Sequence, residues 1–283
     1  MADVFSTTTT HDKFIPDVWS KETVIARESV LVMPNLVRRF DVDVASYGDV
    51  IHIPKVSNLS AGDISTSTGQ IDAQAPTEGE VTITINKWKG VRMKVLDIVL
   101  AQSKYDFRKL YTEKMGYALG VQIEQDLLGN AVYSGGATGP SYTVGTFQTD
   151  LTDANLHRAV QYLDDARVPF EDRHMIIKPA QKNAILGIDK FVRYDATGER
   201  GLVNVGKVPG ELYGVMTHVS PEVYVSTSNV SNMMFHKDFL ALAMQKSIKI
   251  EQFARVGFLD DFGGSELYGF NLLRQDHAVE LRS

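Results

Sequence analysis

The hydrophobic and polar residues alternate along two stretches in the first third of the chain. Residues 50–56 (VIHIPKV) form one strand-like run, and residues 80–95 form a longer one, interrupted only by Lys87 and Lys89. A period of two is typical of a β-strand. At about 3.3 Å per residue the longer run would extend roughly 50 Å, whereas a compact chain of this length has a radius of gyration of only about 19 Å.

A polar segment joins the two runs. Residues 57–79 are rich in Gly, Ser, Thr and Ala and show no helical period, and loops this long are unusual inside compact domains. We therefore interpret residues 48–95 as a long two-stranded flap. The low hydrophobicity of its tip predicts disorder in the monomer and order in an assembly. Because an isolated hairpin is marginally stable in water, we expect the flap to rest on another molecule.

A long helix is predicted over residues 106–128. Apolar residues recur there every four positions from Phe107 to Leu127, Ser103 and Asp106 have the spacing of a capping box, and Gly129 is a stop signal. The charged residues on the other faces indicate a solvated or interfacial side. They are Arg108, Lys109, Glu113, Lys114, Glu124 and Asp126.

The middle of the chain alternates between helix and strand. A helix capped by Thr152 ends before Pro169, residues 175–177 read as a buried strand, and Pro179 opens another helix. This succession predicts an α/β module. The remainder is mostly β, apart from an exposed loop over residues 191–210.

Composition and charge narrow the class of protein. The 283 residues carry a net charge of −6 and no cysteine. An acidic chain is unsuited to sequence-specific nucleic-acid binding, and without thiols neither disulfides nor thiolate metal sites can form. The first residues lack a signal-peptide pattern, and no apolar run approaches ~18 residues. We therefore expect a cytoplasmic protein with no membrane partner.

The motifs that resemble catalytic or binding signatures fail on their context. No pair among the seven histidines has the spacing of a metal motif. Residues 201–207 match a phosphate loop, but Val208 stands where Ser or Thr must hold magnesium. A DFG triplet at residues 261–263 lacks the rest of the kinase set, and there is no G-x-S-x-G elbow. We predict no catalytic, cofactor-binding or metal-binding residues.

The densest polar cluster lies within residues 162–179. Asp164 and Asp165 are adjacent, so on a helix they point about 100° apart and cannot face one reacting atom. Glu171, Asp172 and Arg173 follow Pro169, where charged turn residues are expected. A helix-to-strand turn is therefore the favoured interpretation, and a hydrolase built on Asp164 to Asp172 is the competing hypothesis from another class.

The order of these parts resembles the major capsid proteins of tailed bacteriophages, whose Johnson fold is shared with herpesvirus shell proteins and encapsulins. The resemblance covers nearly the whole chain, through loose patterns. It rests on a helix ending LD-x-x-x-VP, a charged turn with an arginine, and a buried strand closing on proline. Here these are Leu163, Asp164, Val168, Pro169, Arg173 and residues 176–179.

The resemblance implies an α+β fold with four parts. These are an N-terminal arm (1–47), an extended β-hairpin loop (48–95), a peripheral domain with a long spine helix (96–150 and 231–283) and an α/β axial domain (151–230). The implied function is self-assembly into hexamers and pentamers of an icosahedral shell around a double-stranded DNA phage genome. An encapsulin-like protein compartment is the alternative.

The resemblance also implies partners and contact residues. We expect contacts between subunits at Lys87, Trp88, Lys89 and Arg92, where Trp88 would anchor and the cations would pair with acidic residues of a neighbour. The chain has no room for the assembly domain that some relatives carry, so a separate scaffolding protein is expected. A portal, a possible decoration protein and DNA bound without sequence specificity complete the partners. The implied location is the virion capsid, assembled in the host bacterial cytoplasm, with no cofactor.

Overall fold

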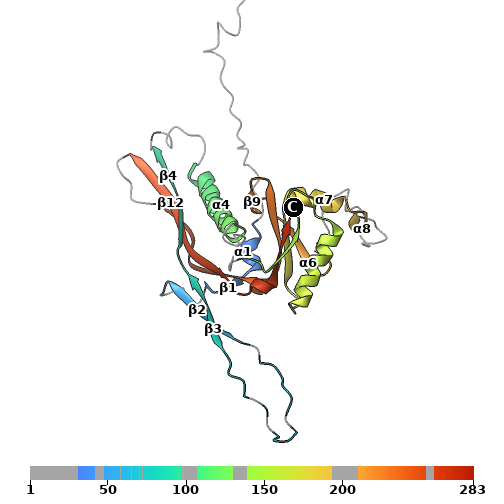
Figure 1. Ribbon diagram of the computed structural model, residues 1–283. Coiled ribbons are helices and arrows are strands. Elements are labelled where there is room, and N and C mark those ends of the chain that lie inside the picture. Colours follow the sequence, from blue (N-terminus) through green and yellow to red (C-terminus); the bar gives the residue numbers. More distant parts are fainter. Residues whose placement is uncertain are drawn as a thin grey trace, which may run out of the picture.

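The described parts of the chain form two sheets and a projecting hairpin (Figure 1). The computed structural model describes residues 31–41, 48–57, 59–64, 66–69, 71, 73–96, 98, 107–129, 139–192, 210–252 and 258–283. Three sequence predictions lie outside these ranges: most of the N-terminal arm, the capping box at Ser103 and Asp106, and most of the loop over residues 191–210.

A seven-stranded sheet forms one half of the body. Its path is β5 (Tyr142–Gly145), β13 (Ala278–Arg282), β10 (Asn229–His236), β6 (Arg173–Ile177), β8 (Val215–Val219) and β7 (Glu211–Leu212), with β9 (Val225–Ser226) paired to β10. On one face, Met175 and Ile177 of β6 pack against Leu156 and Leu163 of α6 (Asp153–Asp165). The other helices of this half are α7 (Pro179–Leu186) and α8 (Asp189–Val192).

The predicted helix-to-strand turn is confirmed. Thr152 caps α6 by accepting a hydrogen bond from the amide of Asn155, and every residue of β6 is buried. β10 and β13, which the resemblance assigned to the peripheral segment, are hydrogen-bonded into the same sheet as β6. The sheet that holds the α/β module therefore takes strands from both sides of residue 230.

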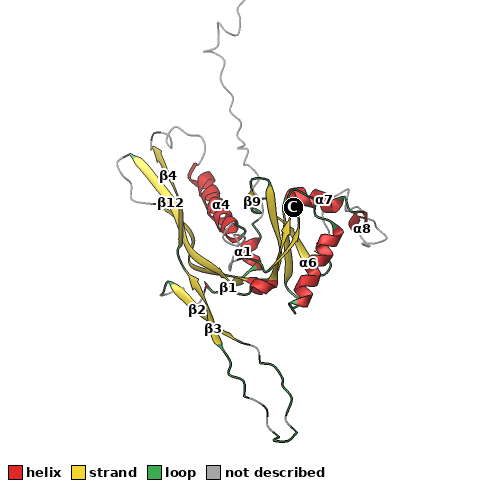
Figure 2. Ribbon diagram, in the orientation of Figure 1, coloured by secondary structure: helices red, strands yellow, loops and turns green. Residues whose placement is uncertain are grey.

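A four-stranded sheet forms the other half. Its order is β1 (Arg38–Arg39), β11 (Leu240–Gln252), β12 (Leu259–Leu272) and β4 (Lys87–Leu96). The predicted long helix is α4 (Phe107–Leu127). It runs beside β4 and β12 (Figure 2). Short helix α1 (Met33–Leu36) contacts α4.

One core joins the two halves. Side chains from α4, from β10 and β6, and from β11 and β12 pack into a single buried cluster. Its largest fully buried members include Phe235, Phe239 and Tyr268. Because this core contains the C-terminal half of α4, the helix connects the two sheets mechanically. No helix in the described ranges is long and apolar enough to cross a membrane.

The hairpin consists of β2 (Val50–Val56) and β3 (Glu78–Thr84), which pair antiparallel along their whole length. Its base packs on the four-stranded sheet, where Ile83 and Ile85 meet Ala241 and Ala243. The described residues of the segment between β2 and β3 continue away from the body (Figure 1). The predicted hairpin is confirmed.

The prediction of one continuous strand over residues 80–95 is wrong. β3 ends at Thr84, and β4 begins at Lys87 and pairs with β12 rather than with β2. Both strands turn their odd-numbered residues toward packed surfaces. The period of two therefore passes through the break unchanged, and the sequence does not reveal the change of sheet.

Candidate assembly surfaces and polar clusters

The four residues predicted to contact a neighbour lie on β4, on two opposite faces of its sheet. Trp88 and Arg92 point to the exposed face, whereas Lys87 and Lys89 are half-buried on the side of α4. Trp88 is 76% exposed and stands opposite Leu267 of β12. Because of this alternation, the four side chains cannot contact one flat partner together.

Two of the three cations in this set, Lys87 and Arg92, have partners within the chain. The Lys87 ammonium lies 3.5 Å from the Asp126 carboxylate of α4. The Arg92 guanidinium donates hydrogen bonds to both carboxylate oxygens of Asp261. Its Nε lies 2.9 Å from Oδ1 and 3.1 Å from Oδ2. Hydrogen bonding to Arg92 holds the pKa of Asp261 below its usual range. Trp88 is therefore the member of the set with the most accessible surface.

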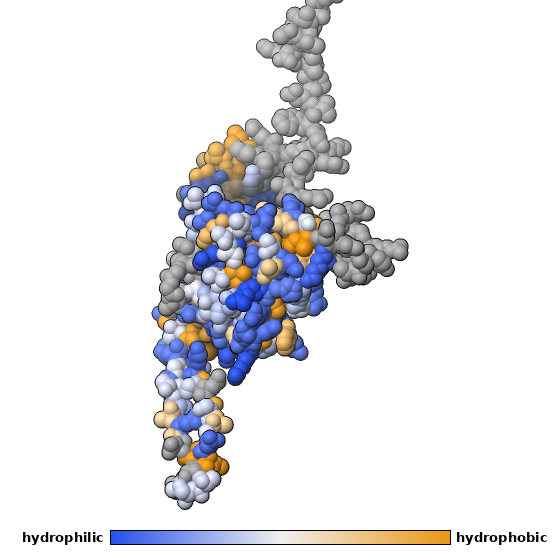
Figure 3. Space-filling model, turned by 45° about the vertical axis from the view of Figure 1, so that its right-hand side comes forward, coloured by the Kyte–Doolittle hydropathy of each residue, from blue (hydrophilic) through white to orange (hydrophobic). Residues whose placement is uncertain are grey.

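The outer hairpin carries exposed apolar side chains. Val56 is 71% exposed, and Leu59, Ile64 and Ile71 are more than half exposed. Figure 3 shows apolar surface near the tip, below the body. The amide of Ser60 donates to Gln74 Oε1 at 3.0 Å, so the two sides remain connected beyond β2 and β3. Exposed apolar surface on a projecting segment is typical of a docking element.

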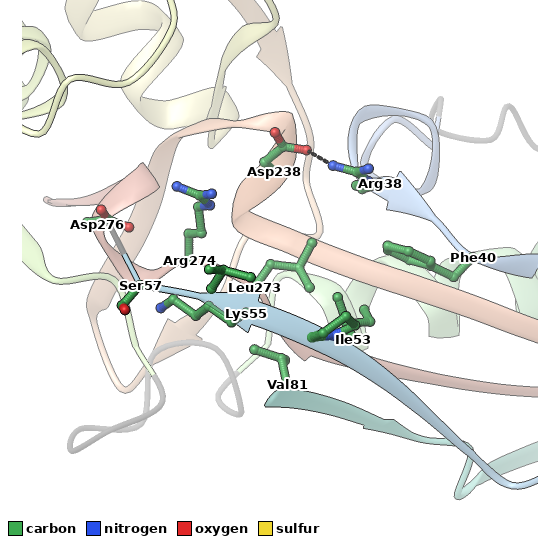
Figure 4. Close-up of a pocket in the computed structure, with 12 residues that line it drawn as sticks. Arg38, Phe40, Ile53, Lys55, Ser57, Val81, Asp238, Leu273, Arg274 and Asp276 are labelled. Carbon is green, nitrogen blue, oxygen red and sulfur yellow. Dashed lines mark hydrogen bonds and ion pairs between the residues drawn. The ribbon is translucent and has the colours of Figure 1, made fainter. Parts of the chain in front are cut away.

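A groove of about 630 Å³ lies between the hairpin base and the body (Figure 4). Ile53 and Val81 line it from the hairpin, and Phe40 and Leu273 line it from the body. The Arg38 guanidinium pairs with Asp238 at 3.0 Å at one end. The opposite end is basic and polar, with Lys55, Ser57, Arg274 and Asp276.

The strand ends distant from the hairpin form a second apolar patch. Leu96 of β4 is in register with Leu259 of β12, and beside them Phe258 is 80% exposed. Ile98 is also mostly exposed. The described structure thus leaves apolar side chains uncovered at both extremities of the molecule.

The cluster at residues 162–179 serves the fold. The Arg173 side chain is 1% exposed, and its guanidinium donates to Asp164 Oδ1 at 2.7 Å, to the Pro169 carbonyl at 2.8 Å and to the Val168 carbonyl at 2.6 Å. Arg173 also stacks on the Phe170 ring. Asp164 is therefore engaged by a buried cation that fixes the turn.

Glu124 is a structural residue that the sequence pattern placed on the wrong side of the helix. The prediction placed it on a solvated or interfacial side of the helix, but it is fully buried. Its carboxylate accepts hydrogen bonds from the Val32 amide at 2.7 Å and from the Ser220 hydroxyl at 2.6 Å. Glu124 thus joins the segment before α1, the helix α4 and the end of β8. Its partners are 92 and 96 residues away in the sequence, so helical periodicity could not predict these contacts.

Two histidines that are distant in sequence meet on the seven-stranded sheet. His174 Nδ1 of β6 and His218 Nε2 of β8 lie 3.4 Å apart. Burial lowers the pKa of both rings, which favours the neutral form. Among the described residues, no group of three His, Cys, Asp or Glu side chains could hold a metal ion.

A family model matches most of the chain, and several solved structures share its fold. A family model described as phage capsid protein matches residues 38–253. A solved structure from Mycobacterium phage Che8 has a TM-score of 0.80 at 23% identity, covering 95% of this chain and 97% of that one. The capsid of cyanophage P-SCSP1u gives 0.77 at 20% identity, with 96% and 93% covered. A native GTA particle capsid gives 0.72 at 10% identity, with 99% of both covered. No curated protein matches.

These likenesses confirm the expected fold class. The mixed α+β architecture is the one seen in the phage capsid structures, over almost the whole chain. The family match is to a phage capsid family, so the comparisons favour a phage shell over the encapsulin-like compartment.

Proposed function

Because the chain belongs to the phage capsid protein family, we propose that it is the major capsid protein, whose copies assemble as hexamers and pentamers of an icosahedral shell around a double-stranded DNA genome. It is a structural protein of the virion capsid. The proposal gives the chain no catalytic residue and no cofactor, and its mechanism is the association of surfaces.

The hairpin is the observation that carries the proposal. It projects from the body and bears Leu59, Ile64 and Ile71, each more than half exposed. Fully burying one such side chain contributes about 1.5–3 kcal/mol, part of which is offset by ordering the hairpin. In a closed shell each subunit both gives and receives this contact, so modest contacts add up.

The exposed face of the four-stranded sheet is the surface that we assign to a neighbour's hairpin. Trp88 offers a large apolar anchor there, with Arg92 on the same face. The hairpin strands carry the exposed carboxylates of Glu78 and Glu80, which complement this cation. Lys87 and Lys89 lie on the α4 side of β4, so we place them at the rim of the contact.

Further partners follow from the same proposal. A separate scaffolding protein would direct assembly in the host bacterial cytoplasm, and a portal and a decoration protein would complete the shell. DNA would be enclosed without sequence-specific contacts, consistent with the net charge of −6. The proposal requires no membrane partner.

The test is electron microscopy with size-exclusion light scattering, on the protein expressed alone and with its neighbouring genes. We expect closed particles or large capsomer arrays. Trp88→Ala should lower the particle yield at least tenfold while the subunit stays folded, and Trp88→Phe, which keeps an aromatic anchor, should assemble. A stable monomer under every condition refutes the proposal. Normal assembly of Trp88→Ala refutes the assignment of this surface.

A further inference from the structure

Glu266 is an anomaly among the buried carboxylates of the described residues. It lies on β12, is fully buried, and neither of its carboxylate oxygens has a hydrogen-bond partner. Glu124 and Asp261 are equally inaccessible, but each is held by donors. Burying a charge without a partner is costly, so this side chain needs a physical explanation.

The charged groups that act on Glu266 lie on α4 and on β4, the strand paired with β12 on the side away from β11. Lys89 of β4 is its register partner across the strands, and no ion pair joins the two side chains. Asp126 of α4 adds a nearby negative charge and is held by the Tyr268 hydroxyl at 2.8 Å and by Lys87 at 3.5 Å. Lys87 and Tyr268 therefore interact with Asp126, and Glu266 has no hydrogen-bond donor among the described residues.

These surroundings favour the protonated acid. Burial and the charge of Asp126 raise the pKa of Glu266 to about 7, and Lys89 opposes them only in part. An exposed glutamate has an ordinary pKa of about 4.3. The pKa of Glu266 is raised only while α4 covers the side chain, so proton binding is linked to this packing.

We propose that Glu266 is a proton-controlled latch between α4 and the four-stranded sheet. The packing seen here holds the acid form, and loss of the proton favours a shifted packing in which the carboxylate reaches Lys89 or water. The advantage of the closed packing is complete below the ordinary glutamate pKa, falls as the pH rises toward about 7, and stays constant above it. The latch belongs to the single subunit. In a shell, the latch would make the angle between helix and sheet depend on pH. Only this use rests on the proposed function.

The experiment compares wild type with Glu266→Gln, in which a neutral amide replaces the acid. Amide hydrogen exchange of α4 and β12 is measured on unassembled subunits between pH 5 and pH 8, with intrinsic rates corrected. In the wild type we expect protection to fall about hundredfold as the pH rises, and in Glu266→Gln to stay nearly level. Glu251→Gln is the matched control, because Glu251 is exposed on β11 of the same sheet. It should follow the wild type.

Two further measurements keep the proposal testable if Glu266→Gln folds poorly. Lys89→Met removes the cation that opposes the raised pKa of Glu266, so the fall in protection should continue to a higher pH than in the wild type. Infrared difference spectroscopy should show the carbonyl stretch of a protonated carboxylic acid at pH 6, and its loss at pH 8. Equal pH dependence in wild type and Glu266→Gln, or no acid band at pH 6, overturns the latch. Since all samples are unassembled, neither result depends on whether particles form.

Discussion

Replacing Glu124 tests whether one buried carboxylate holds three parts of the chain together. The side chain lies on α4, and its two oxygens accept bonds from the Val32 amide and the Ser220 hydroxyl. Glu124→Ala removes both bonds and leaves two donors without a partner in a site that excludes water. The prediction is therefore a large loss of stability, although Glu124 contacts no proposed partner surface.

The magnitude follows from the two bonds. A hydrogen bond to a charged group contributes about 1.5–3 kcal/mol, and removing one member of a buried charged network costs about 3–5 kcal/mol. We expect Glu124→Ala to lower the free energy of unfolding by about 3–5 kcal/mol. Glu124→Gln retains one carbonyl acceptor and should lose about half as much. Urea denaturation of the unassembled subunit, followed by circular dichroism, measures both.

The control for this change lies on the same helix. Glu113 is exposed, and Glu113→Ala should change the free energy of unfolding by less than about 0.5 kcal/mol. The reasoning is refuted if Glu124→Ala and Glu113→Ala are equally stable. Selective exposure of the segment before α1 to protease in Glu124→Ala alone would locate the loss at the predicted junction.

Two further substitutions test the turn and the hairpin base. Arg173→Lys keeps the charge but loses the planar fork that bonds two turn carbonyls, so we expect a loss of about 2–3 kcal/mol in thermal or urea unfolding; a change below 0.5 kcal/mol would contradict this role. A Cβ at Gly269 would stand 2.2 Å from the Thr84 carbonyl oxygen. Gly269→Ala should therefore destabilise the protein by about 1–3 kcal/mol and loosen the hairpin in limited proteolysis, whereas Gly79→Ala, whose Cβ has room, should not.

The sequence predicted the elements whose signals are local. The four-residue recurrence gave α4, the Thr152 cap and Pro169 gave α6, and the polar stretch between two alternating runs gave the hairpin. Each pattern depends on neighbours within a few positions, where side-chain direction is fixed by the backbone period. Such patterns can be recognised without knowledge of the rest of the fold.

The errors concern long-range pairing. The period of two continued through Ile85 and Asn86, where the chain leaves the hairpin and joins β12, which lies more than 160 residues further along the sequence. In the same way, no local rule brings His174 to His218, or Ser220 to Glu124. Register and burial decide these contacts, and both depend on segments that a short window does not contain.

The polar residues that resemble a catalytic site and the apolar residues proposed for assembly differ in their exposure to solvent. The dense polar cluster around Arg173 and the carboxylate of Glu124 turn inward, because buried charges are tolerated only with nearby donors or acceptors. The apolar side chains at the hairpin and beside Phe258 remain uncovered at the extremities. In a self-sufficient monomer this distribution would expose hydrophobic surface without benefit, so it favours a chain that completes its burial against other copies of itself.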